Sequence, residues 1–267
     1  MVHDSGFLEL CNRASKAATE AIADFVGTAE ANRTLHQGAD GTATKVIDEV
    51  AENAIFEVFK SDGRSMRIVS EEFGEKVFGN NPEFAVLLDP LDGTYNAAFG
   101  IPCYCVSIAI GNPDLSDTRF GYVRNLADGE TYHAESGKHA YLNGKRIKTS
   151  DNSNLNEFCI SVYECHPKVQ RTTKLCKKVR RIRILGSVAL ELCYVASGKI
   201  DAFIDVRGAL RLTDVAAGKL IVEESGGVVT NSLGAGLKLP GSFANRVDMI
   251  ASNGCAHMEI LKLSARR

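Results

Sequence analysis

The sequence has no excess of either charge and no long hydrophobic run. Its 31 lysines and arginines nearly balance 33 aspartates and glutamates, which gives a formal net charge of −2. A protein that binds nucleic acid by bulk attraction to phosphate needs a basic excess, so we expect no nucleic-acid partner. No apolar run approaches the roughly 18 residues that span a bilayer, and the segment MVHDSGFLEL lacks the features of a signal peptide. We therefore expect no membrane partner and a cytoplasmic location.

Cysteine is too sparse for a disulfide scaffold. The chain has 8 cysteines in 267 residues, whereas small stapled domains are far denser in cysteine. It lacks a CxxC pair, and Cys103 and Cys105 are separated by a single residue, so the spacing does not predict a zinc site. We interpret the cysteines as reduced and mostly buried.

What the chain does contain is a globular composition that begins with two helical patterns. Its hydrophobic fraction is 45%, and its length suffices for one large α/β domain or two modest ones. Apolar residues recur at helical spacing over about residues 5–26 and 45–60. The polar stretch 28–41 between them predicts an exposed, mobile loop. Whether this loop acts as a lid stays open.

Strand patterns follow, first alone and then in alternation with helices. Apolar runs such as residues 84–88, together with the hairpin signal Asn143-Gly144, predict an antiparallel sheet. From about residue 155, strands alternate with helices expected at 167–178, 187–196 and 214–224, which indicates helices packed on a mixed sheet. We predict an α/β protein with an N-terminal α+β part at residues 1–150 and a C-terminal α/β part at 151–267, packed as one unit.

The chemistry is concentrated in the run DPLDGT, residues 89–94, which follows an apolar strand. Strand ends are where α/β sheets place ligands, and Pro90 and Gly93 hold the turn in a defined shape. Asp89 and Asp92 repel each other unless a cation lies between them, and hard oxygens suit Mg²⁺ or Mn²⁺. The alternative interpretation is an Asx-turn that caps a short helix.

Three further acidic positions favour the same chemistry. Glu71 follows another short strand, Asp214 is expected at the N-cap of a helix, and Asp48 lies near the start of the second predicted helix. Taken singly, Asp214 is more often a helix cap and Asp48 a solvent-facing side chain. Together with Asp89 and Asp92, these acids at strand ends and helix starts could converge on a multi-metal site.

These motifs resemble those of the inositol monophosphatase superfamily of Mg²⁺-dependent, lithium-sensitive sugar phosphatases. The resemblance rests on Glu71-Glu72, the DPLDGT run and the segment DVAAG at residues 214–218, in that order over nearly the whole chain. The run DGTATKVID at residues 40–48 is similar to the archaeal-type fructose-1,6-bisphosphatase/inositol-1-monophosphatase. The resemblance implies a layered αβαβα sandwich, the α+β sugar-phosphatase fold, and a homodimer.

The resemblance also implies a set of metal ligands. Glu71, Asp89 and the backbone carbonyl of Leu91 would hold a first ion, and Asp89, Asp92 and Asp214 would hold a second. A weaker third site would involve Glu71 and, through water, Asp48. Two or three Mg²⁺ per active site are therefore expected, with Mn²⁺ as an alternative.

The catalytic residues implied by the resemblance are Asp48, Glu71 and Thr94. Asp48 supplies the water-mediated contact of the third site, and with Thr94 it would orient and deprotonate the attacking water. Gly93 and Thr94 would bind the phosphate, with Asp92 also at the substrate. Phosphate monoester hydrolysis needs neutralised oxygens and a positioned water, so no nucleophilic serine or cysteine is required.

The substrate end is expected where a strand runs into a helix through a Gly-Ser turn. In the family this segment lines the sugar pocket, which implies Arg183, Gly186, Ser187 and Val188 as substrate-binding residues. A Gly-Ser cap is common in α/β proteins, and some of the basic residues around Arg183 must simply be solvated. Arg207 could hold a second phosphate and so favour a bisphosphate, or it could form a surface ion pair with a neighbouring aspartate.

The leading hypothesis is a Mg²⁺-dependent phosphomonoesterase that acts on small sugar phosphates, namely fructose 1,6-bisphosphate and inositol 1-phosphate. The rival enzyme is a 3′-phosphonucleotide or NADP phosphatase on the same site, which would need a cleft large enough for adenine. An inactive scaffold is disfavoured because every acidic position is present. The sequence ranks neither these substrates nor the two metals.

Overall fold

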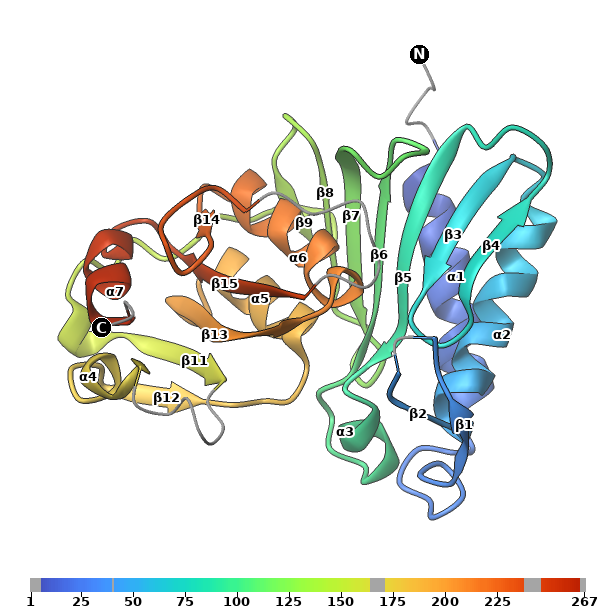
Figure 1. Cartoon of the computed structure of the whole chain (residues 1–267), viewed down its shortest axis with the longest axis horizontal. Helices are drawn as coiled ribbons and strands as arrows, with labels where there is room; N and C mark the ends of the chain where they lie inside the picture. Colours follow the sequence, from blue (N-terminus) through green and yellow to red (C-terminus); the bar gives the residue numbers. More distant parts are fainter. Residues whose placement is uncertain (1–5, 40, 164–170, 238–245, 265–267) are drawn as a thin grey trace.

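The elements are stacked in five layers (Figure 1). The computed structural model describes residues 6–39, 41–163, 171–237 and 246–264. Helices α1 and α2 cover the outer face of a first sheet, α5 and α6 lie between the two large sheets, and α4 and α7 cover the second sheet. The predicted αβαβα sandwich is confirmed. The helices are α1 (Phe7–Ile22), α2 (Val46–Ser61), α3 (Thr94–Ala98), α4 (Thr173–Cys176), α5 (Val188–Ala196), α6 (Leu212–Glu224) and α7 (His257–Ser264).

The first sheet is antiparallel except for one parallel pair. Within the described residues its spatial order is β10-β9-β8-β7-β6-β5-β3-β4, and β3 and β5 are parallel. The hairpin between β9 and β10 turns at Asn143 and Gly144, which both have positive φ as predicted. The strands are β3 (Met66–Ser70), β4 (Gly74–Phe78), β5 (Phe84–Asp92), β6 (Cys105–Gly111), β7 (Thr118–Asn125), β8 (Thr131–Glu135), β9 (Ala140–Leu142) and β10 (Lys145–Arg146).

The second sheet is mixed, as the alternation of strands and helices indicates. Its order is β12-β11-β13-β15-β14, with β11 parallel to β12 and β13, and β15 antiparallel to β13 and β14. Its strands are β11 (Cys159–Tyr163), β12 (Arg181–Arg183), β13 (Ala202–Leu210), β14 (Val228–Thr230) and β15 (Val247–Ser252).

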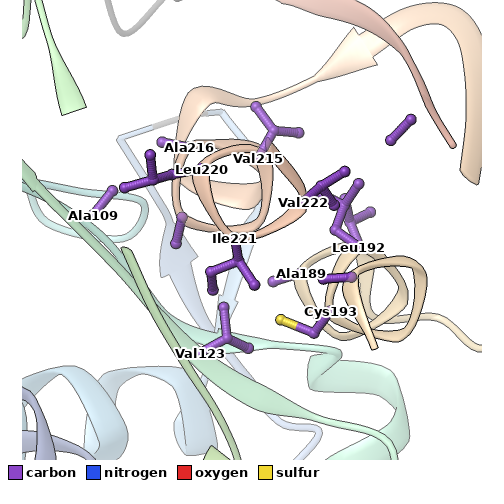
Figure 2. Packing of buried hydrophobic residues seen from close by; sticks show 14 of the residues in the cluster. Ala109, Val123, Ala189, Leu192, Cys193, Val215, Ala216, Leu220, Ile221 and Val222 are labelled. Carbon is purple, nitrogen blue, oxygen red and sulfur yellow. The ribbon is translucent and has the colours of Figure 1, made fainter. Parts of the chain in front are cut away.

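The layer between the sheets is closely packed (Figure 2). Ile221 of α6 and Cys193 of α5 lie near Val123 of β7, all in one buried cluster. A Cβ atom on Gly218 of α6 would lie 2.6 Å from Leu192 Cδ1 of α5, so the two helices meet where α6 has no side chain. Among the described residues, no helix combines the length and apolar character needed to cross a bilayer.

Some predicted element boundaries and one predicted loop differ from the structure. The first helix is shorter than 5–26, and the strand expected at 84–88 continues to Asp92. The stretch 28–41 is not a loop throughout, because β1 (Thr34–Gln37) pairs with β2 (Ala43–Lys45). Residues 167–170 of the helix expected at 167–178 lie outside the described part, and within 171–178 the α-helix is α4 (Thr173–Cys176).

Candidate active site

A polar pocket of about 670 Å³ lies where the two large sheets and the start of α2 come together. Its walls include Asp48, Glu71 and Asp92 from the first half of the chain, and Gly186 and Asp214 from the second. The predicted acidic positions are thus brought to one place, although they are spread over more than half the sequence.

The end of β5 supplies Asp89 in an unusual environment. Asp89 is 1% exposed, and its Oδ1 accepts the Leu91 N–H at 3.0 Å. Its Oδ2 is buried and has no hydrogen-bond partner among the described residues. Between Asp89 and Asp92 the pairing with β6 slips, as in a β-bulge, so the strand reaches the pocket with irregular backbone. Gly93 follows with φ 96°, and a Cβ there would lie 2.8 Å from the Cys103 carbonyl oxygen.

Glu71 reaches Asp89 because β3 and β5 are parallel neighbours. Ser70 pairs with Leu88, so the next residue of each strand lies at the same end of the sheet, and the Glu71 N–H donates to the Leu88 carbonyl at 3.2 Å. The adjacent Glu72 accepts a hydrogen bond from the Thr44 hydroxyl and also lines the pocket.

Asp48 and Asp214 occupy equivalent positions at two helix starts. Each is the third residue of its helix, and each accepts the backbone N–H of the N-cap: Lys45 to Asp48 Oδ2 at 2.9 Å, and Arg211 to Asp214 Oδ2 at 3.2 Å. The expectation that Asp214 is itself the N-cap is wrong, because the helix begins two residues earlier. Asp48 is 2% exposed and does not face solvent.

The acidic cluster fits a divalent cation. Glu71, Asp89 and Asp214 are buried, and each offers an oxygen that lies within 4.8 Å of the other two. Three hard carboxylate groups are a donor set suited to Mg²⁺ or Mn²⁺, and one of them, Asp89, has an oxygen without a partner in the described part of the chain. Burial first, and neighbouring carboxylates next, raise the pKa of Glu71 and of Asp89 well above the usual range. A bound cation would relieve both effects.

Thr94 and Asp48 form a hydrogen-bonded pair beside this cluster. The Thr94 hydroxyl donates to Asp48 Oδ1 at 2.7 Å and lies 3.2 Å from the Leu91 carbonyl oxygen. Burial, and then the charge of Glu72, raise the pKa of Asp48 to about 7. A carboxylate with this pKa is suited to accept a proton near neutral pH.

Asp92 connects the acidic cluster to the second half of the chain. Its Oδ2 accepts the Ser187 hydroxyl at 2.8 Å and the Ala189 N–H at 2.7 Å, both at the start of α5. Ser187 is the N-cap of α5, as expected. Burial, and then the charge of Asp214, raise the pKa of Asp92 to about 6.

The residues expected to bind substrate are distributed unevenly. Gly186 and Val188 line the pocket, whereas Arg183 is exposed on β12, where it donates to the Ile182 carbonyl at 2.8 Å. Arg207 lies at the pocket wall within β13. Its Nη2 donates to Asp205 Oδ2 at 2.6 Å, so the ion pair considered from the sequence is present.

Sequence reasoning missed several residues of the pocket. Arg211 donates through Nε to Asp214 Oδ1 at 2.8 Å, and its guanidinium also contacts Glu71. Tyr163 belongs to no recognisable sequence motif, yet it lines the pocket. The Arg207 guanidinium lies over its ring, 5.2 Å from the ring centroid. Arg211 lies three residues before Asp214, which is the spacing of a helix capping box. That spacing could have indicated the contact between the two residues.

The comparisons with known proteins agree with this geometry. The family model described as "Inositol monophosphatase family" matches residues 5–266. The chain belongs to the inositol monophosphatase family. A family protein from Methanothermobacter thermautotrophicus, named fructose-1,6-bisphosphatase/inositol-1-monophosphatase, is 44% identical over 232 residues, which are 83% of each chain. Family enzymes use divalent metals, in keeping with the buried Glu71, Asp89 and Asp214.

One other relative and two solved structures extend the comparison. The bifunctional NADP phosphatase/NAD kinase of Methanococcus maripaludis is 37% identical over 97% of this chain, but the match spans about half (49%) of that protein. A solved structure of an inositol monophosphatase–fructose 1,6-bisphosphatase superposes with a TM-score of 0.87 at 32% identity, covering 96% of this chain and 99% of that one. A Pyrococcus horikoshii structure described as similar to inositol-1 monophosphatase gives 0.85 at 33% identity, covering 98% of both chains.

Proposed function

We propose that the chain is a Mg²⁺-dependent phosphomonoesterase that hydrolyses fructose 1,6-bisphosphate and inositol 1-phosphate. The observation that carries the proposal is the buried trio of Glu71, Asp89 and Asp214, of which Glu71 and Asp214 line a polar pocket and Asp89 has an oxygen without a partner among the described residues. The name of the 44% identical relative supports both substrates. Family membership supports the reaction class.

We assign the metal ligands as the resemblance implies. Glu71, Asp89 and the Leu91 carbonyl would hold one Mg²⁺, and Asp89, Asp92 and Asp214 a second. A third ion would reach Asp48 and Glu71 through water, and Mn²⁺ could replace Mg²⁺. When bound, these ions would neutralise the phosphate oxygens and make the attacking water more acidic.

Residues of the chain would accept the proton of the attacking water and bind the phosphate. Because the Thr94 hydroxyl already donates to Asp48, its oxygen can accept a hydrogen bond from water and so align that water. The water proton then passes toward Asp48, whose pKa of about 7 suits a general base. Glu71 completes the catalytic set, and the backbone N–H groups of Gly93 and Thr94 would bind the phosphate.

The sugar would lie against the pocket wall formed by the start of α5 and by β13. Gly186 and Val188 line this wall, while Ser187 supports Asp92 through its hydroxyl. Asp205 holds the Arg207 guanidinium in place at the pocket, where a second phosphate would meet a positive charge. Arg183 has no place in this proposal because it lies outside the pocket lining.

A second candidate function is removal of the phosphate of NADP or of a 3′-phosphonucleotide. The similarity to the bifunctional protein of Methanococcus maripaludis over 97% of this chain favours it. A pocket of about 670 Å³ has room for more than a monosaccharide phosphate. Tyr163 and Tyr95 lie in its lining and offer aromatic surface.

The parts 1–150 and 151–267 would act as one unit in a homodimer in the cytoplasm. Asp92 of the first part is bonded to Ser187 of the second, which supports joint action. The exposed apolar side chains of Tyr95, Phe99 and Ile101 offer a surface for a second copy. The cysteines of the described residues are free, in keeping with a reducing compartment.

A phosphate-release panel tests the function. The substrates are fructose 1,6-bisphosphate, inositol 1-phosphate, a 3′-phosphonucleotide and NADP, each with Mg²⁺ and with EDTA. We expect Mg²⁺-dependent release from the first two and a loss of several orders of magnitude in Asp89→Asn. Release that persists in EDTA would contradict the metal mechanism, and preference for NADP would establish the second candidate.

A further inference from the structure

Arg211 occupies the position between two carboxylates that a cation would need. Its Nε donates to Asp214 Oδ1 at 2.8 Å, and its Nη1 contacts Glu71 Oε1. The side chain is 22% exposed and so reaches the cluster from the pocket side. One guanidinium thus bridges two of the three acids that form the cation cluster.

A divalent cation bound by these acids would lie close to the Arg211 guanidinium. One oxygen each of Glu71, Asp89 and Asp214 lies within 4.8 Å of the other two, and Arg211 is bonded to two of these carboxylates, so the two positive charges would repel each other. Burial dominates the raised pKa of Glu71, and the charge of Arg211 acts in the opposite direction. Arg211 therefore relieves in part the repulsion that a metal would relieve.

We propose that Arg211 is a displaceable counter-cation of the acidic cluster, which bridges Glu71 and Asp214 without metal and turns to the phosphate of the substrate when metal enters. The proposal rests on the proposed function. Arg211 lines the same pocket as Arg207, so a guanidinium released from the acids stays within the space where an anionic substrate binds. Metal and phosphate then bind with positive coupling, because each stabilises the state in which Arg211 has left the acids.

The first test measures metal affinity directly, with Mn²⁺ alone and the full chain, by the EPR signal of free Mn²⁺. Arg211→Gln removes the competing charge, and we expect it to bind Mn²⁺ about tenfold more tightly than the wild type. Arg207→Gln is the matched control: it removes the same charge from the same pocket, but its partner is Asp205 and not a proposed metal ligand. We expect less than about a twofold change there.

The second test adds inorganic phosphate to the same titration. Phosphate should tighten Mn²⁺ binding in the wild type about tenfold more than in Arg211→Gln, since only the wild type has the guanidinium to release. In EDTA, Arg211→Gln should melt about 5–10 °C below the wild type because the buried acids lose a partner. If this variant does not fold without metal, Arg211→Lys keeps the charge with fewer contacts and should show intermediate Mn²⁺ affinity.

The results separate this inference from the function on which it rests. Unchanged or weaker Mn²⁺ binding by Arg211→Gln, or an equal gain in Arg207→Gln, overturns the role of Arg211 while the phosphatase proposal stands. Failure of the wild type to bind Mn²⁺ at all overturns both. Tighter binding in Arg211→Gln alone, with reduced phosphate coupling, supports the displacement.

Discussion

Replacing Asp89 by asparagine should stabilise the metal-free protein while it abolishes metal-dependent activity. Asp89 is 1% exposed, its Oδ2 has no partner among the described residues, and Glu71 and Asp214 lie beside it. A buried polar atom without a partner costs about 1–3 kcal/mol. Asparagine keeps the shape, removes the charge, and offers N–H donors to the neighbouring carboxylates. We therefore expect Asp89→Asn to gain about 1–3 kcal/mol in EDTA, or about 2–4 °C in Tm per kcal/mol.

The pH dependence of stability follows from the same carboxyl group. Burial, and then the charge of Asp92, raise the pKa of Asp89 in the folded protein above its unfolded value. Between the two values the folded protein binds more protons, so the stability of the metal-free wild type falls as pH rises through that window. The decline should be shallower in Asp89→Asn. Calorimetry in EDTA and in Mg²⁺ at several pH values measures both effects. The reasoning would be refuted if Asp89→Asn melted below the wild type in EDTA, or if Mg²⁺ raised the Tm of the variant by as much as it raises that of the wild type.

Three further substitutions test other parts of the site. Thr94→Ala removes the hydroxyl bonded to Asp48, and kcat should fall about 10²- to 10⁴-fold in steady-state assays, while unchanged kcat would argue against the water-positioning role. Gly93→Ala places a Cβ 2.8 Å from the Cys103 carbonyl at a φ of 96°, and urea unfolding should show a loss of about 1–3 kcal/mol; wild-type stability would mean that the turn relaxes. Burial raises the pKa of Glu191 from 4.5 to about 7, so its ionisation lowers stability as pH rises between these values. Melting temperatures of Glu191→Gln, measured at several pH values, should lack that part of the decline. Equal slopes of Tm against pH in the variant and the wild type would count against this role of Glu191.

The sequence predicted well those elements whose ends depend on neighbouring residues, such as a helix that begins at an N-cap. Helix α5 begins after Ser187, whose hydroxyl accepts the Leu190 N–H at 3.4 Å, and the prediction of residues 187–196 differs by one residue. The end of β5 was missed because Asp89 and Asp92 look like a turn in sequence. In the structure the strand continues, since helices cover both faces of the sheet and all nine residues of β5 are buried. The pair β1 and β2 was missed because these short strands are largely exposed and carry no apolar alternation.

The composition of the acidic site was predictable, but its electrostatic partners were not. Asp48, Glu71, Asp89 and Asp214 follow strands or begin helices, positions that sequence patterns reveal. The contact from Arg211 to Glu71 joins residues 140 positions apart, and no local pattern encodes it. It depends on the packing of α6 against the first sheet, which is a tertiary property.

The packing of the two halves explains how the chain tolerates so much buried negative charge. Asp92 accepts hydrogen bonds from the start of α5, and Asn96 Nδ2 donates to the carbonyls of Cys103 and of Leu185 at 2.7 Å, so the pocket wall is tied across the halves. The donors to Asp92 and to Glu71 come from the second half, although both acids belong to the first. The apolar layer of α5 and α6 must therefore stabilise the fold enough to offset an acidic cluster that is unfavourable without a cation. Binding of that cation then adds stability at this cluster, where buried carboxylates repel one another.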